Sequence, residues 1–168
     1  PRQGGPFVSV NLAAIRSELF EGELFGHVKG AFTGAVGREG YIETANGGTL
    51  FLDEVGELPF ELQAKLLWFL EDGSCHRVGE SRLTHVDVRI IAATNRDLQS
   101  DVEAGRYRED LYYRLRSIVL TLPPLRQRGK EDRLLLAQFF LQHFSGQQHR
   151  MDLEFTQGAL DAIEAHQW

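Results

Sequence analysis

Cysteine is almost absent from this chain, as are long hydrophobic runs and a large excess of charge of either sign. Cys75 is the only cysteine, so an internal disulfide is excluded and a reducing compartment is favoured. No apolar run approaches the roughly 20 residues needed to span a bilayer, and residues 1–6 have no signal-peptide character. The net charge of −6 over 168 residues gives no reason to expect binding to nucleic acid or to an anionic membrane. We therefore expect a cytoplasmic protein with no membrane partner.

What remains is the composition of an ordinary globular protein. Hydrophobic residues make up 42% of the chain and charged residues 25%. The length is enough for one domain, or for one domain and part of another. The chain begins without Met and ends at Trp168, directly after a helical pattern. We expect it to be a piece of a longer protein.

The stretch 49–54 is apolar at its centre and ends in two adjacent acids, Asp53 and Glu54. Its uncharged residues follow an Asn-Gly-Gly turn and predict a strand buried on both faces, as in a parallel sheet covered by helices. Ligands of such sheets lie outside the carboxyl ends of the strands, where both acids fall. One acid can hold a magnesium ion and the other can orient an attacking water, which is typical of an ATPase. The alternative is a strand that merely ends at the surface, where acids are common.

Strand-like and helix-like patterns alternate along the chain, which favours an α/β fold with a mostly parallel sheet. Residues 73–85 are polar and rich in turn formers, and predict a loop or hairpin. Pro123-Pro124 interrupts both ladders and helices and marks a boundary before two helices of a small second domain. The expected strands are 7–10, 49–52, 86–93 and 117–122, and the expected helices are 12–25, 61–71, 97–104, 109–115, 131–144 and 156–166.

Polar side chains follow three of the expected strands. Asn11 follows the first, Asp53 and Glu54 the second, and Thr94 and Asn95 the third. If these strands are parallel neighbours, the polar groups gather along one edge of the sheet. A nucleotide site at that edge is therefore predicted. For either asparagine taken alone, the alternative is a buried amide that satisfies backbone groups.

Four motifs in order give the chain a specific resemblance. The first is Gly30-Ala31-Phe32-Thr33-Gly34-Ala35, which follows the ELFGH sequence of residues 23–27. The others are NGGTLFLDE at 46–54, RYREDLYYRL at 106–115 and LPPLR at 122–126. Together they resemble the AAA+ domain of bacterial enhancer-binding proteins, the activators of sigma-54 RNA polymerase, over essentially the whole chain.

The resemblance implies a P-loop NTPase-type AAA+ fold with a mostly parallel sheet flanked by helices. Residues 1–125 would form the α/β subdomain without its first strand and P-loop, and residues 126–168 the start of the helical lid. The implied activity is ATP hydrolysis with Mg²⁺ in a homo-oligomeric ring, usually a hexamer, which remodels the closed complex of the sigma-54 RNA polymerase holoenzyme. DNA would be bound through a domain outside this chain.

The same resemblance implies roles for the strand-end residues. Asp53 matches the Walker B acid that serves magnesium, and Glu54 matches the acid that polarises the hydrolytic water. Asn11 matches the switch asparagine that holds this glutamate. Asn95, with Thr94, stands at the sensor I position near the γ-phosphate.

Arg108 and Arg114 match the arginines that the family presents to the nucleotide of the adjacent subunit. A guanidinium stabilises charge on a transferring phosphoryl group and can raise the rate by about three to five orders of magnitude. For Arg114 the alternative is a pair with Asp110, four residues earlier on the same helix. One unbroken helix would not place Arg108 and Arg114 on the same face. We therefore expect both at the subunit boundary rather than both on one phosphate.

The glycine-rich motif at 30–35 is not a phosphate-binding loop, because Lys29 precedes its glycine rather than following one. Its glycines free the backbone for a tight, mobile projection. Phe32 would then be an exposed apolar group at the tip, which usually marks a partner site, and the Thr33 hydroxyl can bond that partner. In the family this loop touches sigma-54. The alternative is an ordinary turn with Phe32 packed into the core.

One family motif is missing: no G-x-x-x-x-G-K-[ST] sequence occurs in the chain. In the family this Walker A loop lies upstream of the position of Pro1, and the sensor II arginine lies just beyond Trp168. We therefore expect the chain alone to bind ATP poorly and to turn over little of it. Two alternatives to the activator reading are a hydrolysis-deficient AAA+ regulatory module and another AAA+ motor. The loop at 30–35 argues against the second.

Overall fold

The computed structural model describes residues 2–147, 153–166 and 168. The chain forms two compact units, Pro1–Ile118 and Val119–Trp168, and each is described by itself. The boundary between them falls slightly before the predicted one at 125/126. Among the described residues, no helix combines the length and the apolar character needed to cross a membrane.

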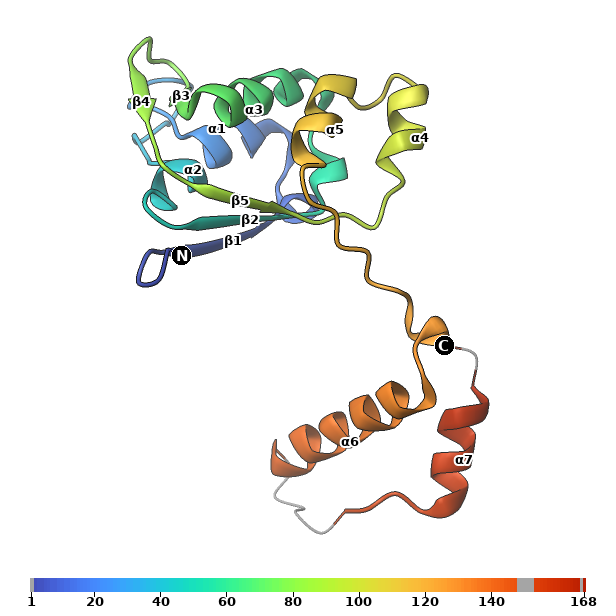
Figure 1. Cartoon of the computed structure of the whole chain (residues 1–168). Helices are drawn as coiled ribbons and strands as arrows, with labels where there is room; N and C mark the ends of the chain where they lie inside the picture. The colour runs from blue at the N-terminus through green and yellow to red at the C-terminus, as the bar shows by residue number, and fades with distance from the viewer. Residues whose placement is uncertain (1, 148–152, 167) are drawn as a thin grey trace. The chain divides into compact units, whose positions relative to one another are not determined.

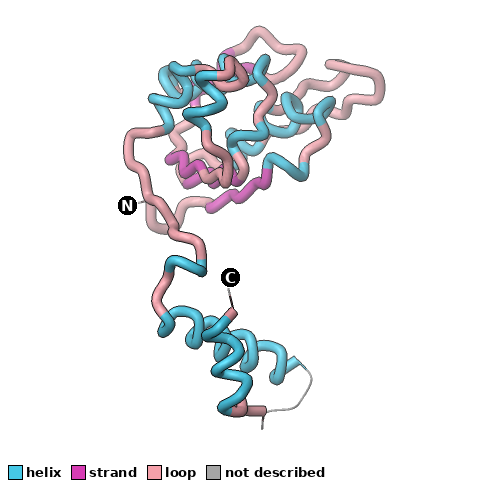
Figure 2. The backbone as a smooth tube through the Cα atoms, turned by 90° about the vertical axis from the view of Figure 1, so that its right-hand side faces the viewer, coloured by secondary structure: helices cyan, strands magenta, loops and turns pink. Residues whose placement is uncertain are grey.

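The first unit is built on a parallel sheet of β1 (Phe7–Asn11), β2 (Thr49–Asp53) and β5 (Arg89–Ala92), in the order β1-β2-β5. The register pairs Asn11 with Asp53 across β1 and β2, and Leu52 with Ala92 across β2 and β5. All three strands therefore end at the same edge of the sheet. Figures 1 and 2 show the sheet from two directions, with the helices of this unit lying to one side of it.

The covered face of the sheet forms the core. Leu50 and Leu52 of β2 are fully buried there, in one hydrophobic cluster with residues of the helices α1 (Phe20–Phe25), α2 (Tyr41–Thr44), α3 (Phe60–Asp72) and α5 (Glu109–Leu115). Burial on both faces was predicted and is wrong for this unit. On the other face Phe51 is half-buried and stacks on Phe7, which is 67% exposed.

The remaining elements of the first unit are short. The predicted loop or hairpin at 73–85 is a hairpin of the antiparallel strands β3 (Ser74–His76) and β4 (Leu83–His85). A 3-10 turn, η3 (Val55–Glu57), follows β2, and α4 (Leu98–Glu103) follows β5. Asp97 caps α4 as predicted, because its Oδ1 accepts hydrogen bonds from the backbone N–H groups of Gln99 and Ser100.

Two sequence-based expectations about these elements are wrong. The single helix at 12–25 is instead two 3-10 turns, η1 (Leu12–Ala14) and η2 (Ser17–Leu19), followed by α1. The chain is extended at Ile15 and Arg16, which breaks the helix although the apolar spacing is helical. Residues 117–122 do not form a strand. Among the described residues they pair with no strand, and their apolar side chains lie exposed.

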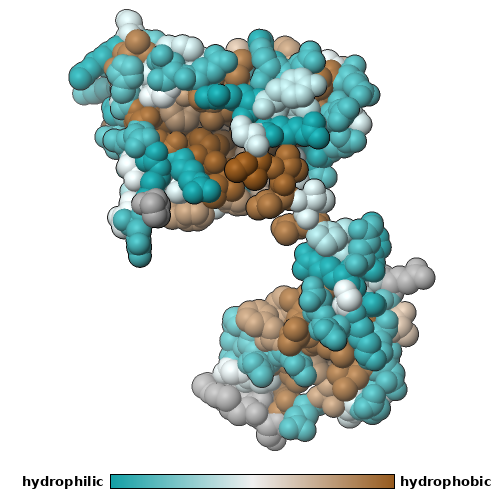
Figure 3. All heavy atoms as spheres, in the orientation of Figure 1, coloured by the Kyte–Doolittle hydropathy of each residue, from teal (hydrophilic) through white to brown (hydrophobic). Residues whose placement is uncertain are grey.

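The second unit contains the turn η4 (Leu125–Gln127) and two helices, α6 (Lys130–Gln147) and α7 (Gln157–Ala165), close to the two that the sequence predicts. Lys130 Nζ lies 2.5 Å from Glu164 Oε1, and Arg133 Nη1 donates to the Glu164 carbonyl at 3.1 Å. These contacts tie the start of α6 to the end of α7. In Figure 3 apolar atoms form part of the visible surface of each unit.

Candidate functional site

The carboxyl ends of the three parallel strands bring the predicted polar residues together. Asn11 and Asp53 are direct register partners. The pairing continues past β2 and β5, because the Ala93 N–H donates to the Leu52 carbonyl at 2.8 Å and the Val55 N–H donates to the Ala93 carbonyl at 2.9 Å. The geometry therefore confirms that these groups share one edge of the sheet.

Glu54 has an unusual backbone conformation directly after the strand. Its φ of 55° and ψ of 49° are left-handed, and no other non-glycine residue in the described part of the chain has a positive φ. Such a conformation costs about 1–2 kcal/mol for a residue with a Cβ, and residues held in such conformations cluster at functional sites. It lies at the junction between β2, which ends at Asp53, and the turn η3, which begins at Val55.

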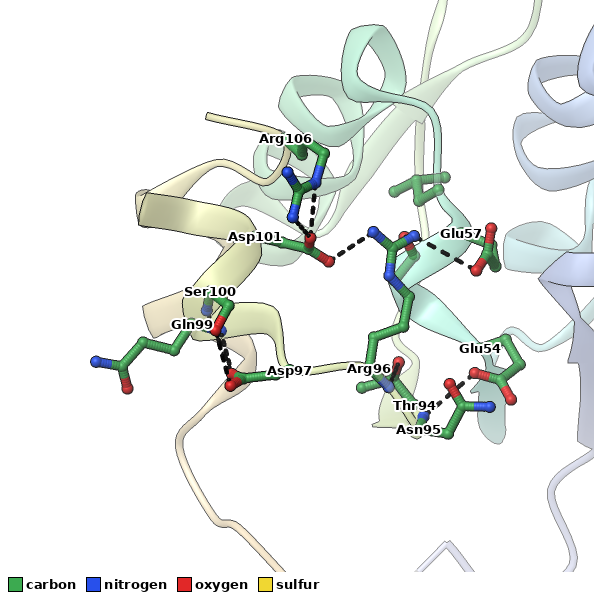
Figure 4. Close-up of polar contacts among 12 residues, drawn as sticks. Glu54, Glu57, Thr94, Asn95, Arg96, Asp97, Gln99, Ser100, Asp101 and Arg106 are labelled. Atoms are coloured by element: carbon green, nitrogen blue, oxygen red, sulfur yellow. Dashed lines mark hydrogen bonds and ion pairs between the residues drawn. The ribbon is translucent and has the colours of Figure 1, made fainter. Parts of the chain in front are cut away.

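Two hydrogen bonds hold the acid pair. The Glu54 N–H donates to Asp53 Oδ1 at 3.1 Å. The Asn95 N–H donates to Glu54 Oε2 at 3.3 Å, as Figure 4 shows. The Glu54 carboxylate is therefore positioned by the backbone that follows β5. Its other oxygen, Oε1, accepts no hydrogen bond from the described residues.

Asn11 contacts a different acid from the one that the resemblance implies. Its Oδ1 accepts from the Ala13 N–H at 2.9 Å, and its Nδ2 donates to Asp53 Oδ2 in a long hydrogen bond of 3.5 Å. In this structure Asn11 thus caps η1 and reaches Asp53 rather than Glu54. The alternative of a buried amide is wrong, because Asn11 is exposed, although its Oδ1 does accept from the backbone.

Thr94 and Asn95 follow β5 at the same edge. The Thr94 hydroxyl accepts a hydrogen bond from the Arg96 N–H at 3.1 Å, a local contact within the turn that follows β5. Asn95 contacts Glu54 through its backbone, and its side chain is exposed beside the two acids. Of this pair, Asn95 is the better placed to meet a ligand at the edge.

The two predicted arginines lie at opposite ends of α5. Arg108 precedes the helix and forms two hydrogen bonds with the Asp110 carboxylate, at 2.7 and 3.0 Å. These bonds lower the pKa of Asp110. Arg114 donates to the Leu70 carbonyl at 2.6 Å, so its expected alternative partner, Asp110, is taken by Arg108. Among the described residues, neither guanidinium has an ion pair or hydrogen bond with Asp53 or Glu54.

Gln63 is a buried polar residue that the sequence analysis missed. It is 1% exposed, and its Nε2 donates to the carbonyls of Leu58 and Arg106 at 3.1 and 3.3 Å. Its Oε1 accepts from the Arg108 N–H at 2.8 Å. One side chain of α3 therefore fixes the backbone on which Arg108 is carried. The sequence signal that could have found it is its spacing: Gln63 lies three residues before Leu66, which places both on the same face of the helix.

The loop at 30–35 is closed by its own backbone. The Gly30 N–H donates to the Ala35 carbonyl at 3.1 Å, and the Ala35 N–H donates to the Phe32 carbonyl at 3.0 Å. Gly30 and Gly34 both have a φ of +84°, a conformation that glycine adopts at low cost. Phe32 is 47% exposed and Thr33 is exposed, so the alternative in which Phe32 is packed into the core is wrong.

The base of this loop is held by His27. Its ring lies 5.0 Å from the Phe32 ring, and its Nε2 is 3.1 Å from the Val36 carbonyl. The backbone of His27 exchanges hydrogen bonds with Arg38 at 2.8 and 2.9 Å, and the Val28 N–H donates to Val78 near the β3–β4 connection at 3.1 Å. A fixed base thus carries an exposed tip.

The donor set at the strand edge fits a magnesium ion that is held mainly by phosphate and water. No group of three or more His, Cys, Asp or Glu residues that could hold a metal occurs in the described residues. Mg²⁺ is usually bound by one or two carboxylates together with substrate phosphates rather than by a closed protein cage. Asp53 and Glu54 supply that kind of partial site.

A parallel sheet with helices packed on it and an acid pair at its carboxyl edge defines the chain as part of an AAA+ α/β domain. The chain belongs to the sigma-54 interaction domain family, whose model matches residues 1–121. This family agrees with the one that the sequence motifs indicated.

Several curated regulators are close in sequence. The chain is 53% identical over 168 residues to the regulatory protein AtoC of Escherichia coli, covering 99% of this chain and 36% of AtoC. It is 50% identical over 164 residues to the regulatory protein LuxO of Vibrio parahaemolyticus, covering 97% of this chain and 36% of LuxO. It is 52% identical over 169 residues to the Nif-specific regulatory protein of Azotobacter vinelandii, covering 100% of this chain and 32% of that protein.

Solved structures agree with the fold. NtrX from Brucella abortus in complex with ADP superposes with a TM-score of 0.90 at 38% identity, over 99% of this chain and 36% of NtrX. The same protein in complex with ATP gives a TM-score of 0.89. The chain thus spans about a third of the length of the relatives that it matches, 36% in AtoC.

Proposed function

We propose that this domain belongs to a ring-forming ATPase that activates transcription by acting on sigma-54 RNA polymerase through the loop at 30–35. The observation that carries the proposal is the arrangement of Asn11, Asp53, Glu54 and Asn95 at one sheet edge, with Glu54 held in a left-handed conformation. The nucleotide-bound forms of NtrX, which match this fold, support ATP as the ligand.

At this edge Asp53 would hold Mg²⁺ and Glu54 would orient the attacking water. The metal, when bound, would neutralise charge that develops on the phosphate oxygens. The free Oε1 of Glu54 is the atom available to accept a proton from the water, because Oε2 already accepts from Asn95. Asn95 would lie near the terminal phosphate, and Asn11 would report on the state of the acid pair through Asp53.

Arg108 and Arg114 would serve the nucleotide of an adjacent subunit. Both lie on or next to α5 and neither pairs with this subunit's acid pair within the described residues. To act as an arginine finger, Arg108 would exchange Asp110 for a phosphate, and Arg114 would leave the Leu70 carbonyl. A homo-oligomeric ring, for which six subunits are usual in the family, supplies the geometry in which each nucleotide meets a neighbour's arginine.

The loop at 30–35 would be the part that touches sigma-54. Its tip presents a half-exposed phenyl ring and an exposed hydroxyl, while its base is bonded to the domain through His27. An exposed apolar group of this kind is suited to a protein partner. Hydrolysis at the sheet edge would change the position of this tip against the polymerase.

The proposal is tested by Thr33→Ala in the full-length protein. We expect ATP turnover to stay within about twofold of the unsubstituted value, because Thr33 forms none of the hydrogen bonds of Asp53 and Glu54 within the described residues. Binding to sigma-54 should fall by at least about tenfold through loss of a hydroxyl at a desolvated contact. ATP hydrolysis and co-sedimentation with purified sigma-54 in the presence of an ATP analogue measure the two effects.

Thr121→Ala is the matched control, because Thr121 is also an exposed threonine and lies outside the loop. It should leave both activities unchanged. Normal open-complex formation by Thr33→Ala would overturn the assignment of the loop. Loss of ATP turnover in the same variant would show that the loop is part of the ATPase site instead.

A further inference from the structure

We propose that Arg96, held by the buried carboxylate of Asp101, couples the turn that carries Glu54 to the segment that presents Arg108. This inference rests on the proposed function. It assigns to Arg96 a positioning role: the state of one nucleotide site would influence the arginine offered to the next subunit.

The centre of this connection is a buried acid between two arginines. The Asp101 side chain is 7% exposed; its Oδ2 lies 2.6 Å from Arg96 Nη2, and its Oδ1 lies 2.7 Å from Arg106 Nη2 and 2.9 Å from Arg106 Nε (Figure 4). The hydrogen bonds from Arg106, together with Arg96, lower the pKa of Asp101. A buried carboxylate of this kind is costly to leave unpaired, so it strongly favours keeping both guanidinium groups in place.

Arg96 extends from this acid to the turn directly after the acid pair. Its Nη1 donates to the Gly56 carbonyl at 2.8 Å and lies 3.4 Å from Glu57 Oε1. A Cβ atom built on Gly56 would lie only 2.9 Å from Arg96 Cδ, so the side chain packs directly on η3. Arg96 therefore bonds both the turn that follows Glu54 and the buried Asp101, and Figure 4 shows its guanidinium group between Glu57 and Asp101.

On the other side of Asp101, hydrogen bonds hold the backbone of each residue from Arg106 to Arg108. The N–H groups of Arg106 and Tyr107 both donate to the Asp101 carbonyl, at 2.8 and 3.1 Å. Tyr107 is 2% exposed, and the Arg108 N–H is fixed to Gln63 at 2.8 Å. Asp101 thus holds Arg106 and Tyr107, and Gln63 holds the Arg108 N–H that follows them.

This arrangement has a consequence for a ring of subunits. Any movement of η3 that accompanies ATP binding beside Glu54 would strain the Arg96–Asp101 pair or move it as a unit with α4. Because Arg106 and Tyr107, which directly precede Arg108, are bonded to Asp101 of α4, the direction of Arg108 would change with it. The nucleotide sites of adjacent subunits would then be coupled. In a typical case, ATP binding at one site changes the ATP affinity of the next site by about 5-fold or more.

The test is the ATP dependence of turnover by assembled rings of the full-length protein carrying Arg96→Met. Methionine keeps the aliphatic packing on Gly56 and removes the charge and the donors. We expect a Hill slope above one in the unsubstituted ring and a slope of about one in Arg96→Met, with ring assembly unchanged by size-exclusion chromatography. Arg96→Lys, which keeps the charge but cannot donate to Asp101 and Gly56 in the same way, should give an intermediate slope.

Arg77→Met is the matched control. Arg77 pairs with Glu43 at 2.6 Å, and the side chains of that pair are 26% and 7% exposed, close to the 32% and 7% of Arg96 and Asp101. It should lower thermal stability similarly while keeping the Hill slope. A slope of one in the unsubstituted ring, or an unchanged slope in Arg96→Met, would overturn the inference alone. Absence of any ATP turnover in the unsubstituted full-length protein would overturn the proposed function as well.

Discussion

At the scale of single residues, the strand-end acids show what a sequence can and cannot predict. The positions of Asp53 and Asn95 at one edge follow from apolar periodicity and from the parallel connections between strands. The left-handed backbone of Glu54 does not, because its residue type gives no signal for a positive φ. The partner of Asn11 was also not predictable, since a capping bond to Ala13 competes for the same amide.

Asp101 gives a prediction about pH at this scale. Its pKa in the folded state is lowered from an ordinary value of 3.8 by the hydrogen bonds from Arg106 and by Arg96. The stability that it contributes is therefore present above that ordinary value and is lost as the pH falls through the lowered one. We expect Asp101→Asn to reduce the free energy of unfolding of the first unit by about 1–3 kcal/mol at neutral pH, and by progressively less below about pH 4.

Urea unfolding followed by Trp68 fluorescence in a Trp168→Phe background measures this effect, because Trp68 is then the only tryptophan. Glu103→Gln is the control, since Glu103 is an exposed carboxylate on the same helix. A destabilisation by Asp101→Asn that is the same at every pH would show that packing, rather than charge, is what Asp101 contributes.

At the scale of elements, the structure explains why some predicted segments formed and others did not. The helix α3 spans Phe60–Asp72 and α5 spans Glu109–Leu115, in agreement with the periodic patterns. The strand expected at 117–122 failed because strand formation needs a hydrogen-bonded neighbour, and periodicity within one segment carries no information about that partner. The buried Gln63 was missed for a similar reason: its partners lie far away in sequence, at Arg106 and Arg108.

Gln63→Leu tests how α3 supports the segment before α5. Leucine fills a similar volume but leaves the Arg108 N–H and the carbonyls of Leu58 and Arg106 without their partner. We expect a loss of about 2 kcal/mol in the free energy of unfolding of the first unit, together with faster amide hydrogen exchange at Arg108.

Gln99→Leu is the matched control, because Gln99 is exposed on α4 and its side chain has no hydrogen bond within the described residues. It should change the unfolding free energy by less than about 0.5 kcal/mol. If Gln63→Leu behaves like this control, water or relaxed backbone must replace the glutamine, and the support of Arg108 by α3 would be refuted.

At the scale of the whole molecule, the motifs predicted the family and the α/β architecture, and both agree with the comparisons. They did not predict that helices would cover only one face of the sheet. A face is buried only where another segment of the protein packs on it, and the strand pattern does not name that segment. Phe7 on the other face is 67% exposed, and Ile91 is 40% exposed. The division into an α/β part and a helical lid is in line with the two compact units and remains our proposal.

The absence of a G-x-x-x-x-G-K-[ST] sequence gives a prediction for the chain of 168 residues by itself. That motif supplies the backbone amides and the lysine that bind the phosphates. We expect the isolated chain to bind ATP weakly and to hydrolyse little of it although the acid pair is intact. Isothermal titration and a phosphate-release assay measure both properties, and robust turnover would contradict this prediction.

The central claim is that Glu54 activates the water that attacks ATP. The most direct measurement is ATP affinity and ATP turnover of Glu54→Gln in the full-length protein, beside Glu61→Gln as a control at an exposed glutamate of α3. Glutamine keeps the size of the side chain and an oxygen that can accept from Asn95, but it cannot act as a base. The account predicts ATP affinity within about threefold of the unsubstituted protein and turnover reduced by at least about 100-fold. Unchanged turnover in Glu54→Gln would contradict it.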